Sequence, residues 1–382
     1  MKIVFLSNFL NHHQTVFCEA LENIAGKGNF TFLASERIDD FRLEMGYSDI
    51  NESTDYVLCV YDSNENFIKA KKLIADCDLL IATGGCPDEY IEEYNKRMIS
   101  GKISFSFGER VYKINYKRFY PKGFLSFRKK HTLYKKYNSY LLCASSYAAK
   151  DYAFFGAYKN KAFKFGYFPD TKIEPQEEQA VKGGEIRILW VGRLITLKRC
   201  EIALYLAEYL KKMNINFTLE IVGSGDRRQF LENLSKKIGV DGKVDFCGSM
   251  PIPEVRKKMR QSDIFLFTSN RQEGWGAVLN ESMSDGCAVV SSAEAGATNY
   301  LIKDGYNGIV FSGKHPEKMY ERVLELCNDR DEIKRLGENA SKTMQELWNA
   351  EAAAKRLVKV YEQIKEGRDP FIYSEGPLSK AD

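Results

Sequence analysis

The sequence predicts an α/β protein of two domains, each built on a parallel sheet. A chain of 382 residues is longer than one ordinary core needs. In both halves short apolar runs alternate with helix-like patterns, which is typical of βαβ units whose sheet is covered on both faces. A polar segment without periodicity, residues 171–185, separates the two series. We therefore expect an N-terminal domain over 1–170 and a C-terminal domain over 171–350.

The N-terminal domain contains six runs that are rich in β-branched and aromatic residues and that predict strands. They are KIVFLSN, FTFLAS, DYVLCV, DLLIATGG, KISFSFG and SYLLCASS. Helix-like stretches such as 14–24 and 66–75 lie between them. The first run reaches polar residues by Ser7 and Asn8 and has no small-residue cleavage site, so it predicts a buried strand and not a signal peptide.

The C-terminal domain repeats this alternation. Its predicted strands are IRILWVG, FTLEIVG, KVDFCG, IFLFTS, CAVVSS and NGIVFS. The segment AVLNESMSDG predicts a helix that ends at Gly286. Residues 351–382 predict a last helix, a candidate to return to the first domain, and a flexible tail from Gly367. Two similar halves imply a cleft between domains, where ligands usually bind.

Composition excludes several classes of protein. With 44% hydrophobic and 28% charged residues and a net charge of +4, the chain is an ordinary globular protein and not a whole-surface nucleic-acid binder. No apolar run approaches the roughly 20 residues that span a bilayer. The nine cysteines are scattered without a C-x-x-C pair, which favours reduced thiols in a cytoplasmic protein over a zinc site or a disulfide framework.

Two cations follow the first strand of the second domain. Gly192, Arg193 and Lys198 come after IRILWVG, and in open α/β sheets the carboxyl ends of the strands face the ligand crevice. Arg193 as a bidentate fork and Lys198 as a point charge would suit a diphosphate, although solvated loop charges are an alternative. Gly223 opens a G-S-G turn after the next strand, which an ordinary strand-to-helix connection explains equally well.

The segment EGWGAVLNE places Glu273 before a helix and Glu281 within it. Gly274 and Gly276 would let backbone N–H groups approach an anion at the helix start. Eight helical residues would separate the two Cα atoms by about 12 Å, whereas paired glycosidase carboxyl groups lie about 5 to 9.5 Å apart. Contact with two parts of one extended ligand is therefore favoured over an acid/base pair on one bond.

Several motifs in order carry a resemblance to a known family. The pattern Glu273-x7-Glu281, with VGRLITLK upstream, VDFCG at 244–248 and DGYNG at 304–308, resembles the C-terminal domain of retaining glycosyltransferases of the GT-B fold, the family-4 type of the glycosyl transferases group 1. The resemblance implies two Rossmann-like domains facing across a cleft. It also implies a nucleotide-diphosphate-sugar donor, bound mainly to the second domain.

The resemblance assigns roles to the residues that match its motifs. Arg193 and Lys198 match the pair that binds the diphosphate, and Glu273 matches the residue that contacts the hydroxyls of the donor sugar; these three form the expected catalytic set. Glu281 matches the ribose-binding residue. The backbone that would hold sugar and phosphate comes from Gly274, Trp275, Gly276 and Ala277, with Gly192 and Gly223 also on the donor side.

No metal or other cofactor is expected. Asp76 with Asp78, and Asp329 with Asp331, satisfy the D-x-D signature of the other large glycosyltransferase fold. The first pair precedes a strand, away from the crevice, and the second falls between helices, so both are expected to be surface charges. Basic side chains and a helix N-terminus can stabilise a leaving diphosphate without a metal.

The N-terminal half offers candidates for acceptor binding. Asn11, His12, His13 and Gln14 resemble a variant of the first-loop motif of bacterial polysaccharide glycosyltransferases, in which that loop lies over acceptor and diphosphate; capping or packing is the alternative. Many relatives carry a His at the end of a mid-domain strand, where this chain has Gly108, Glu109 and Arg110. Glu109 or Arg110 could orient the acceptor, but no base is assigned, and His131 falls too far along to replace the missing His.

Residues 110–136 contain ten Lys or Arg and no acidic residue, with Tyr and Phe interleaved. This composition suits peripheral contact with an anionic membrane. A solvated basic face is an alternative, and nucleic-acid binding is another that nothing else in the chain supports.

The combined interpretation is a glycosyltransferase that moves a sugar from a nucleotide-diphosphate sugar to an acceptor hydroxyl. Retention at the anomeric carbon is implied by the resemblance alone. The expected setting is bacterial surface polysaccharide, lipopolysaccharide or glycolipid assembly in the cytoplasm, at the inner face of the membrane, on a glycan or lipid-linked acceptor. A soluble acceptor and a non-catalytic nucleotide-sugar sensor are the alternatives.

Overall fold

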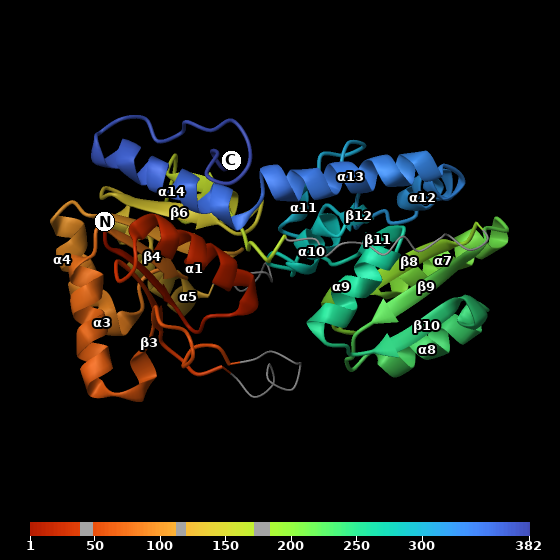
Figure 1. The fold of residues 1–382 in the computed structure, drawn as a ribbon, viewed down its shortest axis with the longest axis horizontal. Coiled ribbons are helices and arrows are strands. Elements are labelled where there is room, and N and C mark those ends of the chain that lie inside the picture. The colour runs from red at the N-terminus through yellow and green to blue at the C-terminus, as the bar shows by residue number, and fades with distance from the viewer. Residues whose placement is uncertain (39–48, 112–119, 172–183) are drawn as a thin grey trace. The chain divides into compact units, whose positions relative to one another are not determined.

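The structure is a computed structural model that describes residues 1–38, 49–111, 120–171 and 184–382 (Figure 1). The chain divides into two compact units. The first unit contains residues 1–170 and 348–382, and the second unit contains residues 171–347.

The first unit has a sheet of seven parallel strands in the order β3-β2-β1-β4-β5-β6-β7. The strands are β1 (Ile3–Ser7), β2 (Phe30–Ala34), β3 (Val57–Cys59), β4 (Leu79–Thr83), β5 (Ile103–Gly108), β6 (Ser139–Cys143) and β7 (Ala162–Lys164). Each of the six predicted runs contains a strand. The sequence analysis missed β7, because three residues are too few to show a pattern.

Helices connect these strands, and side chains define several of their ends. They are α1 (His12–Ala25), α3 (Asn64–Asp76), α4 (Ile91–Ile99), α5 (Pro121–Lys130), α6 (Ala148–Phe154) and α14 (Ala350–Lys365). Asn11 caps α1 by accepting a hydrogen bond from the backbone N–H of His13, and Gly26 ends the helix with φ 85°. Asn349 caps α14 in the same way. The helix α14 then packs on α1, so the last helix belongs to the first unit (Figure 1).

The tail from Gly367 to Asp382 differs from the flexible segment that we expected. It lies along β7, where the backbone N–H of Lys164 donates to Ser379 (2.8 Å) and that of Leu378 donates to Lys164 (2.8 Å). Leu378 is fully buried, and the ring of Phe371 lies 4.9 Å from that of Phe163. The tail therefore covers a strand that would otherwise be an open sheet edge.

A buried arginine joins the amino ends of two strands of the first unit. Arg97, in α4, is 1% exposed, and its guanidinium donates to the carbonyl oxygens of Cys77, Asp78 (2.8 Å) and Ile103 and to the hydroxyl of Ser104 (2.8 Å). Such a charge is tolerated in the interior only because several acceptors surround it.

The second unit has a sheet of six parallel strands in the order β10-β9-β8-β11-β12-β13. The strands are β8 (Ile186–Val191), β9 (Phe217–Val222), β10 (Val244–Gly248), β11 (Ile264–Phe267), β12 (Ala288–Ser292) and β13 (Ile309–Phe311). The helices are α7 (Glu201–Lys212), α8 (Arg228–Lys237), α9 (Ile252–Gln261), α10 (Val278–Ser284), α11 (Thr298–Leu301), α12 (Lys318–Asn328) and α13 (Arg330–Glu346). All six predicted runs contain strands, and β8 and β11 are neighbours at the centre.

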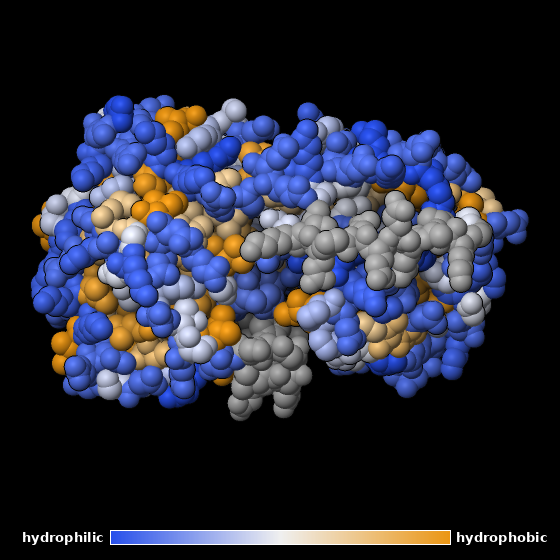
Figure 2. All heavy atoms as spheres, in the orientation of Figure 1, coloured by the Kyte–Doolittle hydropathy of each residue, from blue (hydrophilic) through white to orange (hydrophobic). Residues whose placement is uncertain are grey.

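The two D-x-D pairs lie where the sequence placed them. Asp78 precedes β4 and accepts a hydrogen bond from the backbone N–H of Lys2 (2.7 Å). Asp329 caps α13 by accepting from the backbone N–H of Glu332 (2.9 Å). Within the described residues, no helix is both long and apolar enough to cross a membrane. Hydrophilic residues cover most of the face drawn in Figure 2, with hydrophobic ones gathered in a few places on both units.

Candidate functional site

In the second unit the loops that follow β8 and β11 bring a lysine and a glutamate into direct contact. The Nζ atom of Lys198 lies 2.5 Å from the Oε2 atom of Glu273, and the two side chains are only 13% and 14% exposed. The hydroxyl of Ser269 donates to the same carboxylate oxygen (2.9 Å). A mostly buried ion pair is sensitive to the loss of either partner, because the other charge then stays in a poorly solvated place.

Backbone contacts hold these two loops together. The hydroxyl of Thr268 donates to the carbonyl of Lys198 (2.7 Å) and accepts from the indole N–H of Trp190 (2.9 Å). The backbone N–H of Asn270 donates to Leu197 (2.8 Å). Arg199 adopts a left-handed conformation with φ 50° and donates to the carbonyl of Gly313 (2.5 Å), beyond β13. The carboxyl ends of β8, β11 and β13 are therefore joined around Lys198 and Glu273.

Arg193 lies exposed in the same loop as Lys198. Gly192 and Gly223, expected on the donor side, have a packing role in the structure. Gly223 has φ 129°, and a Cβ atom there would come within 2.0 Å of the carbonyl oxygen of Gly192. The loops after β8 and β9 thus pass so close that only glycine fits at position 223.

The Gly-Trp-Gly turn precedes α10. Trp275 is 1% exposed, and its indole N–H donates to the side-chain oxygen of Asn280 (2.8 Å), so its ring is part of the core. Gly276 has φ 95°, and a Cβ atom there would lie 2.2 Å from the Cζ atom of Phe267. Gly274 is buried and Ala277 is half-buried. This turn can offer backbone groups to a ligand, whereas the Trp275 side chain serves packing.

Glu281 is in the first turn of α10 and is 8% exposed. Burial raises the pKa of its carboxyl group to about 7; the charge of Asp285 adds to this effect, and that of Arg256 opposes it. A carboxyl group in such a place is suited to accept hydrogen bonds from ligand hydroxyls, because those bonds replace the solvent that it lost.

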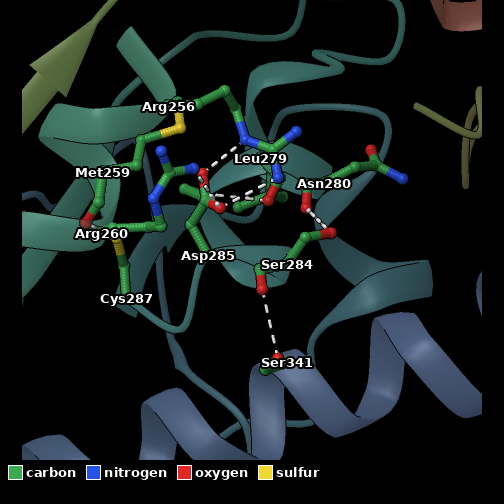
Figure 3. A network of polar contacts seen from close by, with 10 residues as sticks. Arg256, Met259, Arg260, Leu279, Asn280, Ser284, Asp285, Cys287 and Ser341 are labelled. Carbon is green, nitrogen blue, oxygen red and sulfur yellow. Dashed lines mark hydrogen bonds and ion pairs between the residues drawn. The ribbon is translucent and has the colours of Figure 1, made fainter. Parts of the chain in front are cut away.

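Asp285, Arg256 and Arg260 form a network at the end of α10 that the sequence analysis missed (Figure 3). The side chain of Asp285 is fully buried and accepts hydrogen bonds from two arginines of α9. Arg256 donates to both carboxylate oxygens of Asp285, once at 2.9 Å, and Arg260 lies 3.4 Å from one of them. Ser341 of α13 donates to the carbonyl of Ser284 (3.1 Å). These contacts attach α10 to α9 and α13. No local sequence pattern predicts them, since Asp285 lies 29 residues from Arg256.

In the first unit, residues 8–11 connect β1 to α1, so that Asn11 is the N-cap of α1 and His12, His13 and Gln14 are in its first turn. The side-chain oxygen of Asn11 caps the helix, and its amide donates to Gln14 (3.0 Å). Gln14 is buried. His12 and His13 occupy the first helical turn, with ring centroids 3.7 Å apart. For Asn11 and Gln14 the structure thus shows the capping and packing alternative.

The residues after β5 are held by partners from other elements. The hydroxyl of Tyr167 donates to Glu109 (3.2 Å), and its ring lies 6.4 Å from that of His13. Arg110 pairs with Asp151 of α6 (3.2 Å). Tyr167, which the sequence analysis did not single out, therefore lies between His13 and Glu109.

His131 is buried directly after α5, and burial lowers its pKa to about 3, so the imidazole is neutral. Its Nδ1 atom lies 3.0 Å from the hydroxyl of Tyr158, which in turn contacts the hydroxyl of Ser106 (2.6 Å). This hydrogen bonding and burial are those of a packed core histidine.

Comparison with solved structures defines the class of fold. The structure resembles HepE of Anabaena, solved in complex with UDP, with a TM-score of 0.67 and 17% identity over 96% of this chain and 99% of that chain. It also resembles the lipopolysaccharide outer core galactosyltransferase WaaB, with a TM-score of 0.67 and 18% identity over 96% of this chain and 100% of that chain. The two parallel-sheet units therefore have the GT-B fold of glycosyltransferases, as predicted.

In the comparison of sequences, the match to a family model lies within the second unit. Residues 171–343 match the family model of the glycosyl transferases group 1. An uncharacterized glycosyltransferase of Methanocaldococcus jannaschii is 32% identical over 194 residues, which are 50% of this chain and 48% of that protein. A D-inositol 3-phosphate glycosyltransferase of Corynebacterium kroppenstedtii is 29% identical over 188 residues, 47% of this chain and 41% of that protein. The chain thus spans about half the length of the curated relatives it matches.

Proposed function

We propose that this protein is a glycosyltransferase that moves a sugar, with retention of configuration, from a nucleotide-diphosphate sugar to an acceptor hydroxyl. The observation that carries the proposal is the pair of Lys198 and Glu273 at the carboxyl ends of β8 and β11. It lies within the segment that matches the group 1 family model, and Arg193 and Glu281 come from the same unit.

The proposed chemistry uses the charges of this site. The bond between the anomeric carbon and the diphosphate oxygen breaks, and its electron pair stays on the diphosphate. Arg193 and Lys198 would stabilise that charge, as fixed cations do for leaving groups. A diphosphate competes with Glu273 for Lys198, and the carboxylate is then available to the hydroxyls of the donor sugar. The bond from the acceptor oxygen forms on the same face of the sugar, and the acceptor proton leaves to a base that we do not assign.

Related structures suggest which donor and pathway to test first. HepE has also been solved in complex with UDP-glucose, and WaaB is a galactosyltransferase of the lipopolysaccharide outer core. By analogy we propose a UDP-sugar as the first donor to test, and a role in bacterial surface polysaccharide or glycolipid synthesis at the membrane face of the cytoplasm. We further propose that the reaction needs no metal, because cationic side chains are present where the diphosphate would bind.

The test measures donor binding and turnover separately. A panel of nucleotide sugars is screened by thermal shift, because a bound ligand raises the apparent stability. Lys198→Ala should then lower turnover about 100-fold, the usual cost of losing one group that stabilises developing charge. Glu281→Ala should raise the donor Kd about 10-fold or more, since hydrogen bonds to a charged group contribute about 1.5 to 3 kcal/mol.

Lys212→Ala, at an exposed position near the end of α7, is the matched control and should change neither quantity. Wild-type turnover in Lys198→Ala together with wild-type donor affinity in Glu281→Ala would contradict the assignment. Donor binding without transfer to any acceptor and without donor hydrolysis would instead indicate a nucleotide-sugar sensor.

A further inference from the structure

The first unit exposes four large apolar side chains around α5 and α6. Phe124 and Leu125 of α5 are 44% and 61% exposed, Leu133 is 51% exposed, and Phe154 at the end of α6 is 62% exposed. We call these four residues the α5–α6 patch. Large apolar side chains gathered at one place on a surface indicate an interaction site more often than single exposed ones do.

Ring and backbone contacts connect the segments that carry Phe124, Phe154 and Leu133. The ring of Phe155 lies 6.1 Å from that of Phe124 and 5.0 Å from that of Phe154, so it bridges α5 and α6. The hydroxyl of Thr132 donates to the carbonyl of Phe155 (3.0 Å), which brings the turn that carries Leu133 to the same place.

Basic residues accompany the patch. Between residues 120 and 136 there is no acidic residue, while six are basic: Lys122, Arg128, Lys129, Lys130, Lys135 and Lys136. Two nearby acidic groups already have cationic partners, since Asp88 lies 3.1 Å from Lys129 and Asp151 pairs with Arg110. Apolar side chains among an excess of cations match the interface of an anionic bilayer, where the apolar groups enter the acyl boundary and the cations meet the headgroups.

The same two helices hold the segment proposed to orient the acceptor. Tyr152 of α6 packs so closely against Gly108 that a Cβ atom there would lie 2.3 Å from the tyrosine hydroxyl. The preceding residue of α6, Asp151, pairs with Arg110, whose guanidinium also lies 4.3 Å from the ring centre of Tyr147. The loop after β5 is thus attached directly to α6.

A second attachment involves the end of α5. His131 fills the space beside Gly85, in the turn after β4, where a Cβ atom would lie 2.6 Å from the imidazole Cε1 atom. The turns after β4 and β5 both lie at the carboxyl edge of the sheet, where ligands of such sheets bind. The elements that carry the patch therefore also support two turns at the carboxyl edge of the sheet.

We propose that the α5–α6 patch docks on an anionic phospholipid bilayer, and that the acceptor reaching Glu109 and Arg110 is a lipid-linked glycan held in that bilayer. The second part of this inference rests on the proposed glycosyl transfer. The docking itself does not depend on the transfer, and it can be measured without any substrate.

The test is co-sedimentation of the full chain with vesicles of phosphatidylcholine alone and of phosphatidylcholine mixed with phosphatidylglycerol. The protein should bind the anionic vesicles, and binding should weaken as salt is raised. The double variant Leu125→Glu/Phe154→Glu should lower the partition coefficient at least 10-fold, because two apolar contacts are lost and two negative charges are added. Ile99→Glu, at another exposed apolar position of the same unit (75% exposed), is the matched control and should bind like the wild type.

Three outcomes would overturn the docking: no binding of the wild type to anionic vesicles, equal binding to neutral ones, or equal loss in the Ile99 control. Donor binding by the double variant should stay at the wild-type level, while transfer to a lipid-linked acceptor in vesicles should fall at least 10-fold. Unchanged transfer would overturn the link between patch and acceptor. A wild type that docks but never binds a nucleotide sugar would instead contradict the proposed function and leave the docking in place.

Discussion

Replacing Glu281 by Gln tests the electrostatics of the candidate site without any ligand. In the folded protein burial raises the pKa of Glu281 to about 7, from an ordinary value of 4.5. The folded state therefore keeps the proton over a pH range in which the unfolded chain has released it. The corresponding stability is present in full below about pH 4.5 and is lost as the pH rises through about 7. A difference of about 2.5 in pKa corresponds to about 3 kcal/mol.

Gln cannot release a proton, so the variant lacks this pH dependence. Between pH 4.5 and pH 8 the wild type should lose about 3 kcal/mol of unfolding free energy relative to Glu281→Gln. Urea denaturation followed by tryptophan fluorescence measures this, because two of the three tryptophans, Trp190 and Trp275, are buried in the second unit. Glu346→Gln, at an exposed position in α13, is the matched control.

The decisive quantity is the difference between wild type and variant as a function of pH, since other groups titrate equally in both proteins. A difference that stays constant within 1 kcal/mol from pH 4.5 to pH 8 would show that Glu281 is solvated or neutralised by its neighbours. A difference that rises equally in the Glu346 control would place the effect elsewhere in the unit.

Three further variants test the packing. Gly276→Ala should lower the unfolding free energy by about 2 kcal/mol or more, because φ is 95° and the added Cβ would meet Phe267. Its control is Gly305→Ala, where φ is 74° and the space around the added Cβ is open, and it should lower that free energy by about 1 kcal/mol. Equal losses in urea denaturation would refute the steric argument. Arg97→Met should cost about 3 to 5 kcal/mol by leaving buried carbonyl oxygens without donors, and an unchanged melting temperature would contradict this. Deleting the tail after Gly367 should lower the melting temperature by about 4 °C or more, since buried Leu378 and the cover of β7 are lost. Calorimetry of the truncated chain measures this shift, and an unchanged melting temperature would mean that the tail does not stabilise the fold.

Much of the fold could be read from local patterns. Twelve apolar runs contain twelve of the thirteen strands of the described residues, because a buried parallel strand must be apolar along its length. Glycine at position 286 marked the end of α10, since its φ of 81° is unfavourable for other residues. The tail was misjudged because its contacts with β7 are distant in sequence and leave no periodicity.

The candidate site was predicted less completely. The resemblance to the glycosyl transferases group 1 indicated Lys198 and Glu273 as candidate site residues, but not that their charged groups lie 2.5 Å apart. Capping was one of the two alternatives for Asn11, and the structure shows that its side chain caps α1. Trp275 was expected to line the donor site through its backbone, and its side chain proved to be a core residue.

The sequence by itself determined the strands, the order of the motifs and the types of charge at the candidate site, because these depend on neighbours within a few residues. Only the tertiary structure decided which charges meet. Glu273 pairs with Lys198, which lies 75 residues away in the sequence. Asp285, four residues after Glu281, forms ion pairs with Arg256 and Arg260. Contacts between such distant residues follow from the pairing of strands and the packing of helices, which no local pattern encodes.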